Sequence, residues 1–337
     1  MDTEAVLQQL ARPRVSAVEV DGATVPVSTL EREFWPPGNG HPAYTKRDLL
    51  TYLVRVSPYL LPHLRERPLT LSRYPTGIGG KRWFQKHVES TLPPFVVHEP
   101  LYAEQHQSAG EHVFCNNLAT LIWLGQMGNL ELHPWYARRT HAPDALGLGG
   151  DFSSSVEALE ASVLNYPDFM VFDLDPYIYS GREVSGGHPE LNREGFARTC
   201  EAATWLKEVL DHLRLPSFVK TSGKSGLHVL VPIMRQFDYD TVRSVAEQIC
   251  RFVLNQHPTE LTMEWSVERR RGKVFLDYNQ NTRGKTLASA YSPRAAPGAP
   301  VSMPLRWEEL GRVYPDQFNM GSVHQRLAHL GDLWGSI

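Results

Sequence analysis

Cysteine is scarce in this chain, with only three copies in 337 residues. Cys115, Cys200 and Cys250 lie far apart in the sequence, and none of them forms a Cys-x-x-Cys pair. This spacing argues against a disulfide framework and against a cysteine-based zinc site. The 14 histidines are scattered too, so we expect no zinc site and three buried free thiols in a reducing cytoplasm.

Long apolar runs are absent as well, because no stretch approaches the roughly 20 apolar residues that cross a bilayer as a helix. Residues 1–15 are charged and lack the apolar core of a signal peptide. These two features predict a cytoplasmic protein without a membrane partner.

A strong net charge is the third absence, since the formal charge is only −3. This value excludes a protein that coats nucleic acid by bulk positive charge. Cations instead crowd one region of the sequence: Arg269, Arg270, Arg271, Lys273, Arg283, Lys285 and Arg294. Such a run is usually a solvated face, but here it brackets an acidic strand, so a phosphate-facing role is an equal alternative.

The segment 168–176, Asp-Phe-Met-Val-Phe-Asp-Leu-Asp-Pro, is the one around which we organise the chain. Its short, aromatic-rich apolar run predicts a buried strand that Pro176 ends. Side chains alternate along a strand, so Asp173 and Asp175 point to the same face. Two such carboxylates repel each other, and a pair of hard divalent ions would relieve the repulsion. An Asp-x-Asp pair alone is more often a solvated loop, so the metal site depends on the rest of the chain.

The predicted elements from residue 168 onward follow the order β-α-β-β-α-β, which is typical of RRM-like or ferredoxin-like sheets and indicates an α+β fold. We predict strands at 168–176, 218–220, 227–233 and 274–278, and helices at 194–213 and 240–254, the second capped by Asp240. In this topology the first strand lies between the third and the fourth. Asp277 on the fourth strand is therefore expected beside Asp173 and Asp175, and three carboxylates are the minimum for two-metal phosphoryl transfer.

The flanking elements are read from caps and periodicity. Thr45 is predicted to cap a helix that runs to about Leu61, with Asp48 in its first turn. Asn116 or Asn117 is predicted to cap the helix at 118–127. The remaining predictions are a β-rich entry at 15–27, strands at 68–74 and 129–133, and short helices at 156–164, 304–310 and 323–330.

The turn 221–228, Thr-Ser-Gly-Lys-Ser-Gly-Leu-His, joins two of the predicted strands. Its backbone N–H groups, with Lys224 and His228, suit a triphosphate. Gly-Lys-Ser resembles part of a Walker loop, but Phe218 stands where the leading glycine belongs and a strand follows, so we reject that interpretation.

Trp83 and Phe84 are adjacent aromatics among cations, and His133 ends a strand. Two bulky neighbours on one strand cannot both face a single core, so one of them is a candidate stacking platform for bases. A lone histidine such as His133 is more often structural than catalytic.

Several longer motifs stand in a fixed order: Phe-Asp-Leu-Asp-Pro at 172–176, Lys-Thr-Ser-Gly-x-x-Gly-Leu-His-Val at 220–229 and Phe-Leu-Asp-Tyr-Asn-Gln-Asn-Thr-Arg-Gly-Lys-Thr at 275–286. Together with 60–70, 117–124 and 290–310, they resemble the polymerase domain of bacterial and archaeal ligase D. That domain belongs to the archaeo-eukaryotic primase superfamily and serves non-homologous end joining. The resemblance covers about residues 28–335 and implies a primase-polymerase fold, with an RRM-like antiparallel catalytic sheet, helices and an N-terminal α/β lobe.

The resemblance also implies roles for individual residues. Metal-binding carboxylates, usually occupied by two Mn²⁺ or Mg²⁺ ions, match Asp173, Asp175 and Asp277. Contacts to the nucleoside triphosphate match Ser222 and His228, and the lining of the nucleotide pocket matches His133, Arg270, Gln280 and Arg294. An aromatic pair that stacks on the template matches Trp83 and Phe84, and two cations that bind the 5′-phosphate of the downstream strand match Arg32 and Lys46.

The chain departs from the family pattern at three places. The turn lysine usually stands where this chain has Ser225, so Lys224 acts, if at all, from a shifted position. Trp83 stands where phenylalanine is commoner. The surface excursions at 139–165 and 177–191 look longer than in typical members, and no role transfers to them.

These inferences predict a DNA-directed nucleotidyltransferase that adds ribo- or deoxyribonucleotides to primer 3′ ends at gaps and breaks. The expected partners are DNA with 5′-phosphorylated ends, Ku and a DNA ligase, in the nucleoid region of the cytoplasm. A catalytically weak DNA-end-bridging module and a metal-dependent nuclease are the alternatives. We divide the chain into an N-terminal extension (1–27), an N-terminal α/β lobe (28–165), an RRM-like catalytic lobe (166–310) and a C-terminal helical tail (311–337).

Overall fold

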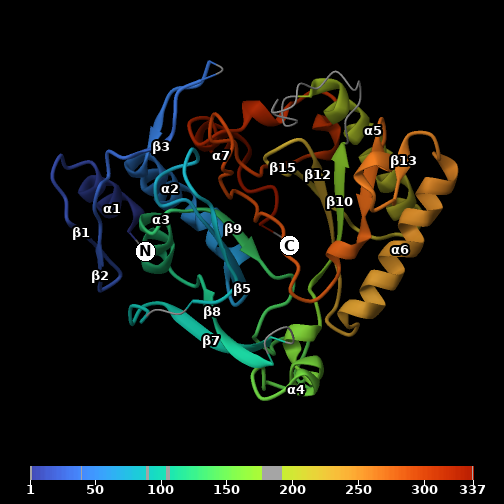
Figure 1. Cartoon of the computed structure of the whole chain (residues 1–337), viewed down its shortest axis with the longest axis horizontal. Helices are drawn as coiled ribbons and strands as arrows, with labels where there is room; N and C mark the ends of the chain where they lie inside the picture. Colours follow the sequence, from blue (N-terminus) through green and yellow to red (C-terminus); the bar gives the residue numbers. More distant parts are fainter. Residues whose placement is uncertain (1, 39, 89–90, 104–106, 177–191, 336) are drawn as a thin grey trace.

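The computed structural model describes residues 2–38, 40–88, 91–103, 107–176, 192–335 and 337. The excursion predicted at 177–191 lies outside these residues. Figure 1 shows the first half of the chain on one side of the molecule and the segment from β10 to α6 on the other.

A six-stranded sheet in the order β13-β14-β10-β12-β11-β15 forms the second half of the molecule. Its strands are β10 (Phe169–Pro176), β11 (Phe218–Thr221), β12 (Leu227–Pro232), β13 (Leu261–Thr262), β14 (Val274–Asp277) and β15 (Pro304–Leu305). The predicted central position of the first strand is confirmed, because β10 pairs antiparallel with β12 on one side and β14 on the other. β13 and β15, which the sequence did not predict as strands, widen this sheet at both edges.

Two long helices, α5 (Arg193–His212) and α6 (Tyr239–Gln256), pack against β10 and lie on the outer side of the sheet (Figure 1). Buried residues recur along α6 at helical spacing, from Val242 to Val253, while its opposite side is exposed. The predicted cap Asp240 is wrong by two residues. Asp238 caps α6 because its backbone is still extended and its carboxylate accepts the N–H of Thr241.

A five-stranded sheet in the order β6-β5-β8-β7, with β9 also paired to β5, forms the first half. Its strands are β5 (Pro68–Arg73), β6 (Trp83–Gln85), β7 (Val97–Ala103), β8 (Ser108–Phe114) and β9 (Asn129–Pro134). Helices α2 (Lys46–Leu64) and α3 (Leu118–Gln126) pack together beside it. The predicted Thr45 cap is confirmed as a capping box with Asp48, and Asn117 caps α3.

The remaining elements are short. They are α1 (Thr3–Leu10), β1 (Ala17–Val20), β2 (Ala23–Pro26), β3 (Glu33–Trp35), β4 (Tyr44–Thr45), α4 (Val156–Ala161), α7 (Val323–Leu330) and the 3₁₀ turns Val163–Asn165, Val267–Arg270, Tyr278–Gln280, Trp307–Glu309 and Pro315–Gln317. The helix predicted at 304–310 is wrong at its start, because Pro304 and Leu305 pair with β11 before a 3₁₀ turn follows.

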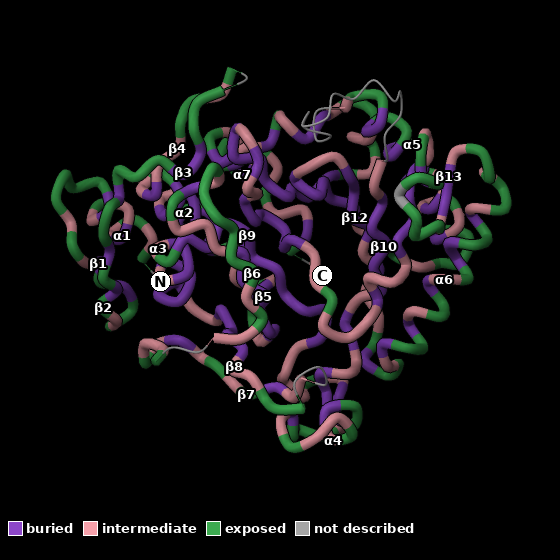
Figure 2. The backbone as a smooth tube through the Cα atoms, viewed as in Figure 1, coloured by how far each residue is buried: buried purple, intermediate pink, exposed green. Residues whose placement is uncertain are grey.

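The segment 288–302 links the two halves by returning from the second sheet to the first. Tyr52 on α2 donates to the carbonyl of Tyr291 at 2.7 Å, and the indole of Trp35 donates to the carbonyl of Arg294 at 3.0 Å. Buried segments occur in both halves in Figure 2, and a single large cluster of apolar side chains spans them. The bounds of the four predicted segments stay a prediction.

All three cysteines are buried free thiols, as predicted, and burial raises the pKa of Cys200 to about 11. None of the helices in the described ranges combines the length and the apolar character that crossing a membrane requires.

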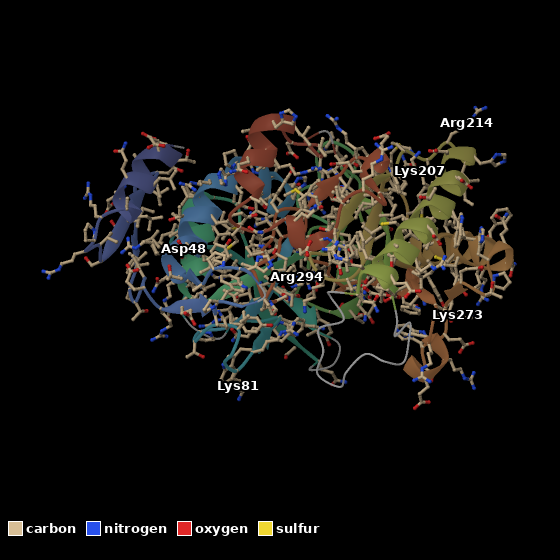
Figure 3. All side chains as sticks on the ribbon, turned by 90° about the horizontal axis from the view of Figure 1, so that it is seen from above. Asp48, Lys81, Lys207, Arg214, Lys273 and Arg294 are labelled. Carbon is tan, nitrogen blue, oxygen red and sulfur yellow. The ribbon has the colours of Figure 1, made fainter. Side chains whose placement is uncertain are left out.

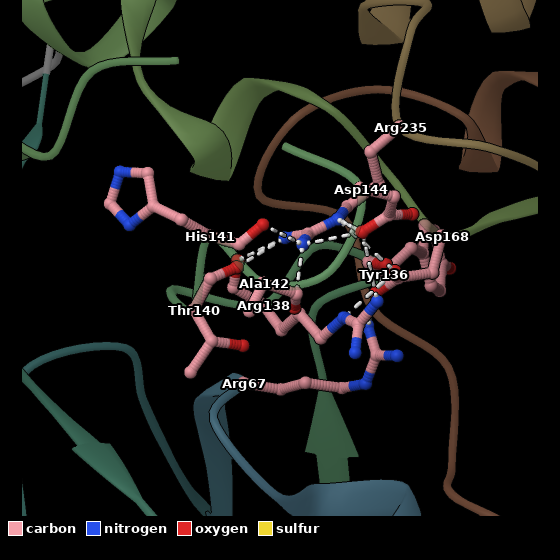
Figure 4. Close-up of polar contacts among 9 residues, drawn as sticks. All are labelled: Arg67, Tyr136, Arg138, Thr140, His141, Ala142, Asp144, Asp168 and Arg235. Atoms are coloured by element: carbon pink, nitrogen blue, oxygen red, sulfur yellow. Dashed lines mark hydrogen bonds and ion pairs between the residues drawn. The ribbon is translucent and has the colours of Figure 1, made fainter. Parts of the chain in front are cut away.

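A buried arginine anchors the segment 137–145 to the end of β12. Arg235 is only 2% exposed, and its guanidinium donates to the carbonyls of Arg138, Thr140, His141 and Ala142. It also donates to Asp144 Oδ1, at 3.0 Å from Nε and 2.7 Å from Nη2 (Figure 4). The charge is thus fully paired inside the protein, which is the condition under which a buried guanidinium is tolerated.

Two further arginines extend the contacts of Arg235 to the start of β10. Arg67 and Arg138 hold the two carboxylate oxygens of Asp168, at 2.7 and 3.0 Å (Figure 4). Because Asp168 directly precedes β10, the network connects the segment 137–145 to the strand that carries the acidic pair.

We predict that Arg235→Gln lowers the free energy of unfolding by about 3–5 kcal/mol, because it leaves several buried carbonyls without their donor and Asp144 with Arg138 as its remaining arginine partner. Urea unfolding followed by circular dichroism measures this loss. Arg251→Gln is the control, since Arg251 lies exposed on α6 beside Glu247 and its loss should leave stability nearly unchanged. Equal small effects of both changes would contradict the anchoring role of Arg235.

Candidate active site

Sheet register places the predicted carboxylates together. Asp173 on β10 lies directly opposite Asp277 on β14, and Asp175 follows two residues later on the same face. The amide nitrogen of Gln280 donates to Asp173 Oδ2 at 3.3 Å and to Asp277 Oδ2 at 3.2 Å. Three carboxylates therefore converge at one end of the central strands, as the strand order predicted.

Burial raises the pKa of all three carboxylates, and repulsion between them adds to this effect for Asp173 and Asp175. Burial is the largest cause for Asp173, whose pKa rises well above its ordinary value, and repulsion from Asp175 and Asp277 adds to it. Burial and the charge of Asp277 raise the pKa of Asp175, and burial raises that of Asp277. A nearby cation would oppose each of these effects.

The donor set fits a hard divalent cation. Carboxylate oxygens are the ligands that Mg²⁺ and Mn²⁺ prefer. Asp173 Oδ1 is buried without a hydrogen-bond partner and lies 3.4 Å from His228 Nε2, so one oxygen remains to be satisfied. Within the described ranges, no three His, Cys, Asp or Glu side chains already close around a common point, so binding needs small side-chain rotations.

The turn after β11 is shaped by its own hydrogen bonds. The hydroxyl oxygen of Ser222 accepts the backbone N–H groups of Lys224 and Gly226, each at 3.1 Å. Gly223 has a φ of +75°, which suits glycine. A Cβ at position 226 would stand 2.5 Å from Asp175 Oδ1, so a glycine is required where the turn approaches the carboxylates.

A buried glutamate that the sequence reasoning missed holds two of the predicted residues. Glu131 Oε1 accepts from Arg294 Nε at 3.1 Å and from the backbone N–H of Ala295 at 3.0 Å, and its Oε2 lies 3.0 Å from His133 Nε2. Although burial raises it, the pKa of Glu131 is lowered overall by Arg294 and His133. The signal was available, because Glu131 and His133 are two residues apart and share one face of β9.

Lys220 is a second buried residue that the sequence reasoning passed over, although it begins a quoted motif. Its ammonium lies 2.5 Å from His228 Nδ1 and is 2% exposed. Burial lowers the pKa of both groups, and Arg294 nearby lowers both further.

A hollow of about 270 Å³ collects most of the predicted nucleotide residues. Its lining includes His133, Asp173, Asp175, Ser222, Lys224, His228 and Arg294, with Ser225 and the segment 286–288. Arg294 lies near the centre of the molecule in Figure 3, between the two halves. The lining of the hollow therefore combines carboxylates with cationic and hydrogen-bonding side chains.

Arg270 and Gln280 lie beside the hollow without lining it. Gln280 contacts the carboxylates as described above. Arg270 is 8% exposed, donates to the carbonyls of Glu264 and Trp265 at 2.6 and 2.9 Å, and stacks over the ring of Phe275 at 3.6 Å. In this arrangement the guanidinium of Arg270 organises the loop before β14.

The predicted DNA residues lie in the first half of the chain. Trp83 and Phe84 on the edge strand β6 are both exposed, at 49% and 54%, and Lys81 and Arg82 lie over their rings. Exposure of both rings goes beyond the expectation that one of them is at the surface. Phe84 also lines a larger hollow of about 830 Å³ together with Lys86 and Arg283.

The two cations predicted to bind the 5′-phosphate differ in exposure. Arg32 is exposed and donates to the carbonyl of Pro75 at 3.0 Å. Lys46 is buried, and its ammonium donates to Ser28 O and Thr29 Oγ1, both at 3.1 Å. Burial lowers the pKa of Lys46, and the neighbouring charge of Arg32 adds to this effect. Their phosphate role stays a prediction.

An RRM-like sheet with acidic residues on its central strands, next to the glycine turn that joins β11 and β12, is typical of a primase-polymerase fold. The chain belongs to the family "LigD, primase-polymerase domain", whose model matches residues 45–334. This match confirms the resemblance drawn from the motifs.

Curated relatives agree with this assignment. The chain is 33% identical over 294 residues to the multifunctional non-homologous end joining protein LigD of Pseudomonas aeruginosa, covering 86% of this chain and 30% of that protein. It is 30% identical over 290 residues to the bifunctional non-homologous end joining protein LigD of Bacillus subtilis, covering 85% and 40%. The chain therefore spans between 30% and 40% of the length of these two relatives.

A solved structure shares the fold. The polymerase domain from Mycobacterium tuberculosis Ligase D, in complex with DNA, superposes with a TM-score of 0.75 at 24% sequence identity. The superposition covers 92% of this chain and 96% of that domain, so the primase-polymerase fold is confirmed.

We predict that Mn²⁺ raises the melting temperature of this chain and that Asp173→Asn abolishes the rise. A ligand that binds only the folded state stabilises it, by about 2.7 kcal/mol when the ligand concentration is 100 times Kd. Thermal unfolding with and without metal measures the shift. Asp211→Asn, an exposed change on α5, is the control. An unchanged metal shift in Asp173→Asn would contradict the site.

Low pH should weaken this metal effect. A carboxylate whose pKa is raised on folding stabilises the fold at pH values below its ordinary pKa of 3.8, and that contribution is lost as the pH rises through the raised value. At neutral pH the metal-free carboxylates therefore destabilise the fold, and Asp173→Asn should raise the melting temperature without metal. The Mn²⁺ shift should shrink as the pH falls into the range of the raised pKa, where protons compete with the metal.

Proposed function

We propose that this chain is a DNA-directed nucleotidyltransferase that extends primer 3′ ends at gaps and double-strand breaks in non-homologous end joining. The observation that carries the proposal is that Asp173 and Asp175 line one small hollow together with Ser222, Lys224 and Arg294, while Asp277 is paired directly beside Asp173. Membership of the LigD primase-polymerase family supports it. A nuclease has no need of the cationic side chains in this hollow, so that alternative is disfavoured.

The carboxylates on β10 and β14 would hold two Mn²⁺ or Mg²⁺ ions. When bound, such ions lower the pKa of the primer 3′-hydroxyl and stabilise the departing pyrophosphate. The remaining residues act on the triphosphate itself. Lys224 and Arg294 place positive charge in the same hollow as the carboxylates, and the hydroxyl of Ser222 is available as a donor because its oxygen already accepts two N–H groups.

Arg294 is held in position for this role. Its Nε is bound to Glu131, and its Nη1 donates to the carbonyl of Ser222. Both contacts fix the guanidinium before substrate arrives, so little reorganisation is needed when charge builds up on the phosphates. His133 contacts the same glutamate and also lines the hollow.

DNA would approach from the first half of the chain. The exposed rings of Trp83 and Phe84 offer stacking surface for template bases, and their neighbouring cations suit the backbone. Arg32, with Lys46 behind it, would bind the 5′-phosphate of the downstream strand. We extend the proposal to a preference for ribonucleotides, to Ku and a DNA ligase as partners, and to a nucleoid-associated location in the cytoplasm.

We predict that Asp175→Asn lowers primer extension on a gapped duplex by at least about 100-fold, because phosphoryl transfer would lose a ligand to the ions that stabilise its charge. The assay supplies Mn²⁺ with ribo- or deoxyribonucleotides and follows a labelled primer. Asp211→Asn serves as the matched control. Near-normal extension by Asp175→Asn would contradict the mechanism.

The same assay separates the alternative functions. Tight end binding by the unmodified chain with no extension would favour the end-bridging module. Cleavage of the labelled DNA with metal and no nucleotide would favour the nuclease.

We predict that Arg32→Ala removes the advantage that a 5′-phosphate gives over a 5′-hydroxyl on the downstream strand. Losing one phosphate contact should weaken binding to the phosphorylated gap by about tenfold or less. Binding of both substrates by fluorescence anisotropy measures the ratio, with the exposed Arg55→Ala on α2 as control. An unchanged ratio in Arg32→Ala would exclude this residue as the phosphate sensor. Lys46 is a poorer choice, since its removal also leaves Ser28 O without its donor.

A further inference from the structure

Four residues form one row across the central strands of the six-stranded sheet. Lys220 on β11 lies opposite His228 on β12, His228 lies opposite Asp173 on β10, and Asp173 lies opposite Asp277 on β14. Residues that lie directly opposite one another in antiparallel strands share a face of the sheet. The row therefore runs from a buried ammonium, through an imidazole, to two carboxylates.

The ammonium of Lys220 has three acceptors around it. Its Nζ lies 2.8 Å from Ala288 O, 2.6 Å from Ser302 Oγ and 2.5 Å from His228 Nδ1. A carbonyl oxygen only accepts, and Ser302 Oγ uses its own proton on Thr221 O at 2.8 Å. Both of these groups therefore take an N–H from Lys220, and the remaining position on Nζ faces the imidazole.

With Lys220 charged, this geometry sets which ring nitrogen of His228 carries the hydrogen that faces the site. A neutral Lys220 would instead accept from Nδ1–H and leave Nε2 without a hydrogen, and the first test below separates the two cases. If Lys220 donates to Nδ1, the neutral imidazole carries its hydrogen on Nε2. If the proton moves across to Nδ1, the ring becomes an imidazolium and Nε2 still carries a hydrogen. Nε2 lies 3.4 Å from Asp173 Oδ1, and an unprotonated Nε2 would point its lone pair at that carboxylate.

We propose that Lys220 is a positioning residue that holds the imidazole of His228 with its Nε2–H directed into the nucleotide hollow. His228 then acts as a fixed donor to an oxygen of the incoming triphosphate, a step that rests on the proposed function. Lys220 is almost fully buried and does not line the hollow, so it acts only through His228.

The first test reads the ring directly and needs no activity. In protein labelled with ¹⁵N-histidine, long-range ¹⁵N–¹H correlation spectra distinguish the two tautomers, and His228→Gln identifies the signal among the 14 histidines. We expect a hydrogen on Nε2 of His228 in the unmodified chain and a shifted or averaged signal in Lys220→Met. A hydrogen on Nδ1 alone in the unmodified chain, or no change in Lys220→Met, would overturn the proposal.

The second test asks whether Lys220 works through His228. Lys220→Met should weaken nucleoside triphosphate binding by about tenfold to 100-fold, the usual range for losing a charge-assisted hydrogen bond. Lys220→Gln, which keeps amide donors, should recover part of this loss. Lys207→Met on α5 is the control, because Lys207 pairs with Asp211 and does not line the hollow.

His228→Gln places an amide where the Nε2–H lies and has no ring hydrogen to direct. In that background Lys220→Met should cost about twofold or less in calorimetric titration with a nucleoside triphosphate. An equal loss in both backgrounds would show that Lys220 is merely structural. If Lys220→Met does not fold, two other results test the proposal. One is the tautomer of His228 in the unmodified chain, and the other is the loss of nucleotide binding by Lys220→Gln with and without His228→Gln. Both can be measured even if the chain does not extend a primer.

Discussion

Repulsion among Asp173, Asp175 and Asp277 is the constraint on which the rest of the structure depends. Antiparallel pairing of β10 with β14 fixes two of these carboxylates opposite each other, and alternation along β10 adds the third. Burial makes their charge expensive, which is why the pKa of each is raised. Buried carboxylates in this arrangement lower the stability of the metal-free protein, and bound divalent cations would remove this cost. The same geometry therefore suits the protein to two-metal chemistry.

Cationic and hydrogen-bonding groups are arranged around this cluster in two layers. Lys220 and His228 continue the row of Asp173 across the sheet. Glu131, on β9 in the other half of the molecule, binds Arg294 and contacts its neighbour His133. Because Arg294 also binds the carbonyl of Ser222, the glycine turn and the first sheet are tied together at the hollow. Catalytic geometry and the joining of the two halves are therefore the same set of contacts, and their loss should affect activity and stability together.

Much of this was predictable from sequence where local rules or strand order decide. The Thr45 cap, the central strand and the pairing of Asp173 with Asp277 follow from capping, alternation and topology. Asp240 was predicted as the cap of α6 although Asp238 is the cap, because aspartate suits a cap at either position and only the backbone decides between them. Pro304 and Leu305 become a strand through pairing with β11, which no local pattern reveals. Glu131 and Lys220 were missed because their roles depend on partners 163 and 82 residues away.

Anomalous diffraction from crystals soaked in Mn²⁺ with a nucleoside triphosphate tests the central claim most directly. The account predicts manganese peaks bonded to the carboxylates of Asp173, Asp175 and Asp277, with the phosphates between them and Arg294. Nucleotide bound in the hollow with no manganese at these carboxylates, or manganese held only by other residues, would contradict it.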